Sequence, residues 1–454
     1  MFSKILIANR SEIALRIIRA ARELGIKTVA VYSESDKNSL HTMLADEKMC
    51  IGPGKASESY LNIPNIIMAA DITKSDAIHP GYGFLAENPR FPEICESQGI
   101  NFIGPPASVM RLMGDKNRAR LEMRKAKLPV TPGSDSIIED LSQAKDIIKR
   151  IGYPVILKAS AGGGGKGMRI VRSEAQLENQ FSIAQTEAKA SFGDASLYLE
   201  KFIEGARHIE IQVIADKKGN IRALGERECS LQRKHQKVIE ETPSPFIDEK
   251  TRRKMIKAVE EAASFIGYQS LGTFEFLVDK DKIFYFMEVN TRIQVEHPIT
   301  EMVYGVDLVK EQIKIAAGEK ISLPSDPKLK GHSIECRINA EDPQTFIPSP
   351  GKIDFLVFPG GLGIRVDSAA YTGWDIPTDY DSLVAKIIAT APTRKDAIEK
   401  MRTALEMTTI VGIKTNIPLH ISLLANSEFK KGNLDIQFLE RFLNKQVPAR
   451  KSDI

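Results

Sequence analysis

A cluster of glycines between two strand-like segments near the middle of the chain restricts both the fold and the function. Residues 162–165 and Gly167 are glycines; they follow the apolar run 155–157, and residues 168–171 again have the pattern of a strand. So many glycines allow several backbone N–H groups to point at one place, an arrangement suited to phosphate oxygens. The segment is therefore expected to be a strand–loop–strand unit.

Two common nucleotide-binding motifs do not fit this cluster. Gly162, Gly164 and Gly167 have the spacing G-x-G-x-x-G, but a dinucleotide fingerprint needs a helix after it, and here a strand follows. A Walker A loop needs Ser or Thr after its lysine, and Gly167 stands at that position. Two interpretations of the segment remain, a mobile surface loop and a flap over nucleotide phosphates. The adjacent Lys158 and Lys166 favour the flap.

Acidic residues are predicted on one face of a β-hairpin whose turn is residues 279–282. If this four-residue turn sets the register, Glu275 lies opposite Phe286 and diagonal to Glu288, with Asn290 on the same face. Two carboxylates and a carboxamide this close repel unless a cation lies between them, and such oxygen ligands suit Mg²⁺ on nucleotide phosphates. A solvated acidic face is the weaker alternative, because phenylalanines flank the acids.

Polar residues continue beyond the hairpin with the same alternation. Arg292, Gln294 and Glu296 follow Asn290 at every second position. Arginine holds carboxylate-like or phosphate-like groups through two hydrogen bonds, and a glutamate can take a proton. The run is therefore interpreted as an anion pocket with a base.

Further polar groups lie between the flap and the hairpin. His208, Glu210 and Gln212 share one face of a strand whose other face is apolar. A single histidine there would more often be structural, but neighbouring polar segments at 200–203 and 232–237 favour nucleotide and anion contacts. Arg337, alone on a later strand, is interpreted from the residues only as a partner in an ion pair.

The chain begins with alternating strands and helices. Residues 5–8 and 27–32 have strand patterns, and 12–24 has helical spacing, so the chain opens with a β-α-β unit. The sequence Gly-Pro-Pro at 104–106 suggests a first domain boundary, and the polar linker 321–331 suggests a second.

Composition excludes several classes of protein. The 454 residues include 63 Lys+Arg and 59 Asp+Glu, a formal net charge of +4, whereas a protein held on nucleic acid by phosphate contacts would carry a clear basic excess. No stretch approaches roughly 18 uninterrupted apolar residues, so we expect a soluble cytoplasmic protein without membrane contact. The cysteines are too widely spread for a zinc knuckle or a disulfide framework, and free thiols are expected at Cys50, Cys95, Cys229 and Cys336.

Longer motifs resemble those of the ATP-grasp superfamily and, within it, of the biotin carboxylases. The likeness covers nearly the whole chain, and its motifs are residues 7–10, 79–84, 162–168, 233–237, 288–297, 335–342 and 412–416. The resemblance implies an α/β fold with α+β elements: a Rossmann-like αβ domain (1–112), an ATP-grasp domain (113–320) with a mobile lid at about 131–203, and a mixed α/β C-terminal domain (332–446).

The resemblance also implies a role for each matching residue. ATP would contact residues of the flap, the adenine hinge and the central strands: Lys116, Lys158, Gly163, Gly164, Gly165, Lys166, Gly167, Met168, Glu200, Lys201, Ile203, His208, Gln232, His235, Glu275 and Glu288. Mg²⁺ or Mn²⁺ would be held by Glu275 and Glu288, with Asn290 beside them. Bicarbonate would meet Lys237, Arg292, Gln294, Val295 and the general base Glu296. Biotin would meet Tyr82 and Arg337.

The implied reaction is the carboxylation of biotin by bicarbonate through carboxyphosphate, the first half-reaction of acetyl-CoA carboxylase in fatty acid biosynthesis. No Met-Lys-Met biotinylation motif occurs, so we expect biotin on a separate carrier protein, a carboxyltransferase as a further partner, and a homodimer. Ser11, Lys166 and Ile203 differ from the residues usual in the family, which are Gly, Arg and Leu.

Three alternatives remain open at this point. The same subunit could serve pyruvate carboxylase or another acyl-CoA carboxylase. Another ATP-grasp carboxylate ligase would lack the set Arg292, Glu296 and Arg337. A nucleotide-sensing or dinucleotide-binding protein without chemistry would bind ATP without magnesium-dependent turnover.

Overall fold

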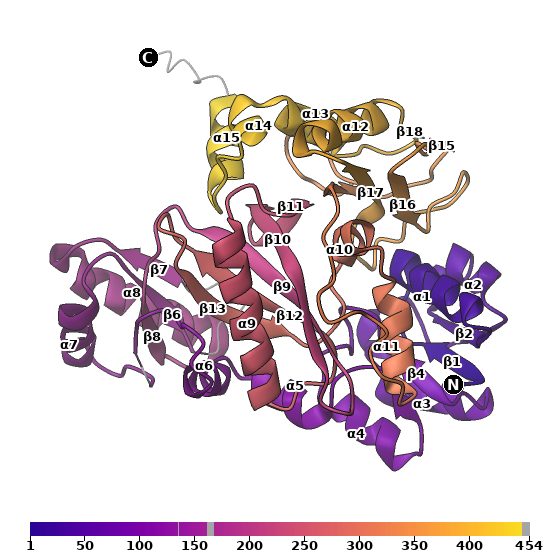
Figure 1. The fold of residues 1–454 in the computed structure, drawn as a ribbon, viewed down its shortest axis with the longest axis horizontal. Coiled ribbons are helices and arrows are strands. Elements are labelled where there is room, and N and C mark those ends of the chain that lie inside the picture. The colour runs from indigo at the N-terminus through magenta and orange to yellow at the C-terminus, as the bar shows by residue number, and fades with distance from the viewer. Residues whose placement is uncertain (135, 161–167, 447–454) are drawn as a thin grey trace.

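The structure is a computed structural model that describes residues 1–134, 136–160 and 168–446 (Figure 1). The first hundred residues form a parallel sheet of five strands in the order β3-β2-β1-β4-β5. Its strands are β1 (Lys4–Ile7), β2 (Lys27–Tyr32), β3 (Glu47–Cys50), β4 (Ala77–His79) and β5 (Asn101–Phe102). The accompanying helices are α1 (Ser11–Glu23), α2 (Leu40–Leu44), α3 (Ile63–Ile72), α4 (Arg90–Ser97) and α5 (Ala107–Gly114). The predicted β-α-β opening is therefore correct.

The turn between β1 and α1 requires an unusual backbone conformation. Ser11, the first residue of α1, has φ +56°, in the left-handed region where a side chain is unfavourable and glycine is tolerated best. The hydrogen bonds of Asn9 Nδ2 to the carbonyl oxygens of Pro80 and Tyr82, both 2.7 Å, hold this turn against the loop after β4.

An antiparallel sheet of eight strands, in the order β13-β12-β9-β10-β11-β14-β17-β16, forms the centre of the molecule. The strands are β9 (Arg207–Ala215), β10 (Ile221–Arg233), β11 (Gln236–Thr242), β12 (Ser270–Val278), β13 (Phe284–Asn290), β14 (His332–Asn339), β16 (Ile364–Ser368) and β17 (Leu383–Ala391). Because β11 pairs with β14, the sheet continues across the polar linker at 321–331. Residues from the central and the C-terminal regions thus share one sheet.

A smaller unit stands apart on one side of the molecule, at the left of Figure 1. Its three-stranded sheet, in the order β7-β6-β8, consists of β6 (Val155–Ala159), β7 (Met168–Val171) and β8 (Leu197–Lys201). The helices α7 (Leu141–Ile151) and α8 (Glu174–Phe192) share its own hydrophobic cluster, and α6 (Lys116–Lys125) leads into it. The strands predicted on either side of the glycines are present.

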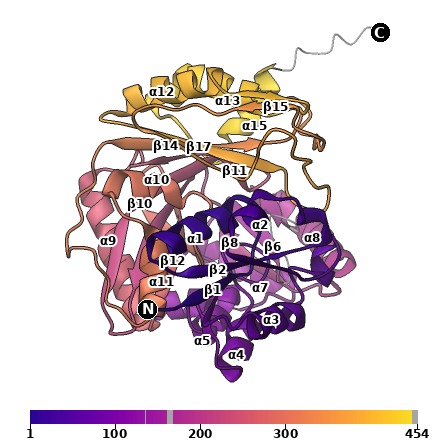
Figure 2. The same ribbon diagram turned by 90° about the vertical axis from the view of Figure 1, so that its right-hand side faces the viewer.

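Helices cover both faces of the large sheet (Figures 1 and 2). Figure 1 shows α9 (Glu249–Phe265) along the central strands, and its apolar side joins Phe274 and Phe276 in one core. Figure 2 shows the C-terminal helices as a layer above β14 and β17. The remaining elements are α10 (His297–Tyr304), α11 (Leu308–Ala316), α12 (Arg394–Glu406), α13 (Ile417–Ala425), α14 (Ser427–Lys431), α15 (Phe438–Gln446) and the ribbon of β15 (Phe355–Val357) and β18 (Thr409–Val411).

The predicted register of the β12–β13 hairpin is wrong. Glu275 lies opposite Glu288 rather than opposite Phe286, which pairs with Phe276. The loop has one more residue than predicted, since β13 begins at Phe284 and the Asp279 carboxylate accepts the N–H of Ile283 at 2.9 Å. A β-bulge then shifts the register by one further residue.

The structure contains no helix long and apolar enough to cross a membrane within the described residues. All four cysteines are free thiols, as predicted, and Cys50 is the exposed one.

Candidate active site

Lys237 is the centre of a buried cluster of charges on β9, β11 and β12. Its ammonium lies 2.5 Å from Glu210 Oε2, 3.0 Å from Glu275 Oε1 and 2.6 Å from Glu296 Oε1. Burial disfavours the charged amine, but the acidic groups around it outweigh burial and raise the pKa of Lys237 well above its ordinary value. The amine therefore stays protonated and bridges three carboxylates.

Glu296 is fully buried immediately before α10, and its side chain does not cap that helix. Its two oxygens are held separately, Oε1 by Lys237 and Oε2 by Arg337 Nη2 at 3.0 Å. Burial would raise its pKa, but the charges of Lys237, Arg337 and Arg227 hold it well below the ordinary value. A substrate anion that drew the two cations toward itself would make this carboxylate more basic.

Arg292 is fixed by polar groups on three sides. Its guanidinium donates from Nε to Glu87 Oε2 at 2.9 Å, from Nη1 to Gln294 Oε1 at 2.9 Å and from Nη2 to Asn290 Oδ1 at 3.0 Å. Gln294 in turn donates to Glu275 Oε1 at 3.3 Å. Arg292 and Gln294 thus contact Asn290 and Glu275 of the hairpin, although the chain is no longer a strand beyond Asn290.

The acidic pair of the hairpin fits a divalent cation bound together with a nucleotide. Glu275 is buried and accepts hydrogen bonds from Asn290 Nδ2 at 2.9 Å and Lys237, while its Oε2 lies 3.0 Å from His208 Nε2. Glu288 lies opposite; its side chain is 39% exposed and 3.5 Å from the amine of Lys116. Glu288 can therefore turn toward a cation and phosphate oxygens without losing a buried partner.

Two tighter groups of potential ligand atoms lie nearby, but cations of the protein already neutralise them. One is His208, Glu210 and Glu275, and the other is Glu210, Cys229 and Glu296. The Lys237 amine contacts a carboxylate of each group. These groups therefore require no metal.

The predicted nucleotide residues of the small three-stranded unit have local polar partners. Glu200 on β8 is paired with Arg120 and, at 2.6 Å, with Lys158. Lys201 donates to the carbonyl oxygen of Tyr153 at 2.7 Å, which ties β8 to the start of β6. Ile203 follows β8, and Met168 is the first residue of β7. The predicted ATP ligands Gly163, Gly164, Gly165, Lys166 and Gly167 lie outside the described residues.

Gln232 lies near the end of β10, and His235 lies in the turn to β11, close to Lys237 in the chain. Gln232 pairs with Lys237 across the two strands, and Lys234 and His235 have φ values of +46° and +67°. The tight turn places His235 in solvent while Lys237 points into the charged cluster.

The residues predicted for biotin, Tyr82 and Arg337, both pair with acidic side chains. Tyr82 donates its hydroxyl to Glu12, which is 3.1 Å from the fully buried amine of Lys386. Lys386 donates to the carbonyl oxygen of Val295 at 2.8 Å, and this hydrogen bond holds the backbone between Gln294 and Glu296. Arg337 forms ion pairs with Glu240 and Glu296, which agrees with the ion pair predicted for it from the sequence.

Two buried cations of the site were missed from the sequence. Arg227 on β10 is fully buried and donates to Glu210, Gln212, Thr273 and Thr300. Lys386 interrupts an otherwise apolar strand, and a charge in such a run was a signal that a buried partner exists. The burial of Arg227 was harder to predict, because its neighbours in the sequence are acidic and the segment does not look like a buried strand.

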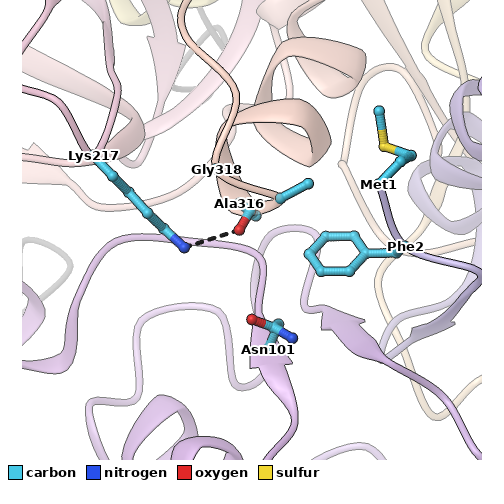
Figure 3. Close-up of a pocket in the computed structure, with 7 residues that line it drawn as sticks. Met1, Phe2, Asn101, Lys217, Ala316 and Gly318 are labelled. Atoms are coloured by element: carbon cyan, nitrogen blue, oxygen red, sulfur yellow. Dashed lines mark hydrogen bonds between the residues drawn. The ribbon is translucent and has the colours of Figure 1, made fainter.

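A pocket of about 330 Å³ lies far from this cluster, where the N-terminus meets the end of α11 (Figure 3). Its Lys217 donates to the carbonyl oxygen of Ala316 at 2.9 Å and so caps the helix. The lysine is thereby occupied in a structural contact.

Three family models match consecutive parts of the chain. Residues 1–110 match the biotin carboxylase N-terminal domain, residues 115–323 the ATP-binding domain of the carbamoyl-phosphate synthase L chain, and residues 335–441 the biotin carboxylase C-terminal domain. These matches and the solved structures below confirm the predicted ATP-grasp α/β fold.

Curated relatives are similar over nearly their whole length. The biotin carboxylase of Haemophilus influenzae is 56% identical over 98% of this chain and 99% of its own. A pyruvate carboxylase subunit of Methanothermobacter thermautotrophicus is 52% identical over 97% of this chain and 90% of its own.

Solved structures agree closely with the fold. A biotin carboxylase–ATP complex from Campylobacter jejuni has a TM-score of 0.93 at 50% identity, covering 97% of this chain and 99% of its own. The biotin carboxylase domain dimer of the Hydrogenobacter thermophilus 2-oxoglutarate carboxylase, with MgADP and bicarbonate, has a TM-score of 0.91 at 50% identity, covering 97% and 98%.

Proposed function

The chain belongs to the biotin carboxylase family and is an ATP-dependent biotin carboxylase, and we propose that the cluster around Lys237 performs the chemistry of its first half-reaction. The observation that carries this proposal is the position of Glu296, a buried carboxylate held between two cations. A small anion that binds Lys237 and Arg292 comes within reach of this base. The alternative of a nucleotide sensor is not favoured.

Bicarbonate binds where Lys237 and Arg292 neutralise its charge, and Gln294 and the backbone of Val295 orient it. As Lys237 turns toward the anion, Glu296 loses part of the attraction that keeps its pKa low, and it takes the proton of bicarbonate. The resulting carbonate attacks the γ-phosphate of ATP, which gives ADP and carboxyphosphate.

Carboxyphosphate breaks down to CO₂ and phosphate beside biotin. The phosphate removes the N1 proton of biotin while Arg337 stabilises the charge on the ureido oxygen, and the nitrogen then attacks CO₂.

ATP lies between the small three-stranded unit and the acidic hairpin. Lys116, Lys158 and His208, with Gln232 and His235, contact its phosphates and ribose, and Glu200, Lys201 and Ile203 lie at the adenine. A magnesium ion held by Glu275, Glu288 and Asn290 would neutralise charge on the phosphates. The Hydrogenobacter thermophilus relative, solved with MgADP and bicarbonate, supports this assignment.

The Glu296→Ala variant tests the proposed base. We expect bicarbonate-dependent ATP hydrolysis, which free biotin stimulates in the wild type, to lose nearly all of its rate. A matched control is Glu249→Ala, because Glu249 is an exposed glutamate on α9 that pairs with arginines of the same helix. Wild-type protein whose ATP hydrolysis does not respond to biotin would contradict the proposal, as would an unchanged rate in Glu296→Ala.

We further propose a homodimer that acts on biotin attached to a separate carrier protein, and a carboxyltransferase as the next partner. The Hydrogenobacter thermophilus domain, solved as a dimer, supports the oligomeric state. Acetyl-CoA carboxylase, and hence cytoplasmic fatty acid biosynthesis, is the first candidate. Pyruvate carboxylase, to which the Methanothermobacter thermautotrophicus relative belongs, is the second. Light scattering tests the dimer, and identification of the biotinylated protein that copurifies distinguishes the two complexes.

A further inference from the structure

Arg337 is held by two carboxylates that come from different parts of the chain. Its Nε donates to Glu240 Oε1 at 2.7 Å, and its Nη2 contacts the same oxygen. Nη2 also donates to Glu296 Oε2 at 3.0 Å. Both carboxylates are fully buried, so water cannot reach Arg337 to take the place of either one.

These two carboxylates differ in what happens to them during turnover. In the proposed function, on which this inference rests, Glu296 takes the proton of bicarbonate and becomes neutral. A neutral carboxylic acid attracts a guanidinium far less than a carboxylate does, so the contact between Arg337 and Glu296 weakens at that moment. The next step, the deprotonation of biotin, is the one that needs Arg337 in place.

We propose that Glu240 is a positioning residue that keeps Arg337 in place for biotin after Glu296 has been protonated. Glu240 is suited to this role because its one bonded oxygen receives two donors of the same guanidinium. Its other oxygen, Oε2, is buried without a hydrogen-bond partner among the described residues. Among the described residues, the side-chain hydrogen bonds of Glu240 are therefore made with Arg337.

The neighbour across the sheet supports this assignment. Glu335 on β14 pairs directly with Glu240 on β11, and both of its oxygens are buried without a partner in the described structure. Burial raises the pKa of Glu335 well above its ordinary value, with the charges of Glu240 and Glu296 adding to the rise and those of Lys386 and Arg337 opposing it. A raised pKa shifts Glu335 toward its neutral form, which reduces its repulsion of the adjacent Glu240.

Glu240 itself is poised between its two forms. Burial raises its pKa to about 7, with Arg337 opposing the rise and Glu296 adding to it. Protonation of Glu296 removes that repulsion and so favours the charged form of Glu240 at the stage at which Arg337 depends on it. Assays at about pH 8 keep the wild-type carboxyl mainly ionised.

The sequence offers a matched control in the next residue. Glu241 is equally buried on β11 but points to the opposite face, where it binds Arg394 through both oxygens, at 2.6 and 3.0 Å. Glu240→Gln and Glu241→Gln therefore remove one buried carboxylate charge each from an arginine, and only the first arginine lies in the site.

The experiment compares two rates for each variant at pH 8: bicarbonate-dependent ATP hydrolysis without biotin, and carboxylation of free biotin. We expect Glu240→Gln to lower biotin carboxylation roughly ten- to a hundred-fold and ATP hydrolysis much less, because a displaced Arg337 affects the biotin step alone. Glu240→Asp, which keeps the charge, should recover part of the loss. Glu241→Gln should change both rates by the same factor.

An equal loss of both rates in Glu240→Gln, or no loss, would overturn the proposal. Arg337→Ala separates this failure from a failure of the proposed function. If Arg337→Ala abolishes biotin carboxylation while Glu240→Gln does not, Arg337 acts as proposed and Glu240 does not position it. If Arg337→Ala leaves biotin carboxylation intact, the role of Arg337 is wrong and the inference fails with it.

Discussion

Glu275 and Glu288 lie directly opposite each other on β12 and β13, on either side of the place where a cation would bind. They differ sharply in surroundings. Glu275 is buried among Lys237, His208 and Asn290, whereas Glu288 is partly exposed beside Lys116. The first carboxylate is thus fixed by the fold, whereas the second has room to move.

The Glu288→Gln variant should require more magnesium. Removing a partly exposed carboxylate weakens the metal ligand set but leaves the buried network around Glu275 intact, so we expect the half-saturating concentration of free Mg²⁺ to rise roughly tenfold or more without loss of stability. The measurement is the rate of ATP hydrolysis against free Mg²⁺ at fixed ATP. Met287→Leu, at the exposed neighbouring position, is the control, and an unchanged magnesium dependence would exclude Glu288 as a ligand.

The Lys237→Met variant should lose stability as well as activity. Without the amine, Glu210, Glu275 and Glu296 remain buried with less positive charge, and breaking a buried ion pair on one side costs about 3 kcal/mol or more. Denaturant unfolding measures this loss. Lys234→Met, at an exposed position of the same turn, should leave stability nearly unchanged, and equal stabilities of the two variants would contradict the bridging role of Lys237.

Part of the site could be predicted from the sequence because it follows the alternation of strands. His208 and Glu210 share one face of β9, so their convergence follows from strand alternation. Arg292, Gln294 and Glu296 lie beyond the end of β13 at Asn290, so alternation does not explain their positions. The roles of Lys116, Tyr82 and Arg337, by contrast, came from the resemblance to a family and not from any local pattern.

The errors and omissions have local physical causes. The hairpin register was wrong because the capping of the loop by Asp279 and a β-bulge each shift the pairing, and alternation does not reveal either. The support of Arg337 by Glu240 was missed because β11 and β14 are nearly a hundred residues apart in the chain. Which strands pair across such a distance in the chain depends on the arrangement of the whole sheet, and no local sequence pattern reveals it.

The Lys158→Met variant should bind ATP more weakly while the fold remains intact. In the structure Lys158 is 2.6 Å from Glu200, and Arg120 pairs with the same carboxylate, so Glu200 keeps a cation when the lysine is removed. One charge-assisted contact to a phosphate is worth about 1.5–3 kcal/mol, which corresponds to a rise in KM for ATP of roughly ten- to a hundred-fold. Steady-state kinetics tests this, with Lys149→Met at an exposed position of α7 as the control. A KM for ATP equal to that of the wild type would show that Lys158 does not reach ATP.

Acid should remove the stabilisation that Glu241 provides on the C-terminal side of the large sheet. Burial alone would raise its pKa, but its hydrogen bond with His332 and its ion pair with Arg394 lower it to about 2, from an ordinary value of 4.5. The unfolded chain therefore takes up this proton at higher pH than the folded protein does. The stabilisation is fully present above the unfolded pKa and is lost as the pH falls toward 2, and the shift corresponds to about 3 kcal/mol.

The Glu241→Gln variant tests this pH dependence, because the glutamine side chain does not titrate. At about pH 7 the wild type should exceed the variant in free energy of unfolding by about 3 kcal/mol. The difference should narrow steadily below about pH 4.5, because protonation makes the wild-type side chain neutral as well. Urea unfolding of both proteins between about pH 7 and pH 3.5 measures the difference, in which the titration of all other groups largely cancels. A difference that stays constant over this range would show that the ion pair with Arg394 does not lower the pKa of Glu241 in the folded protein.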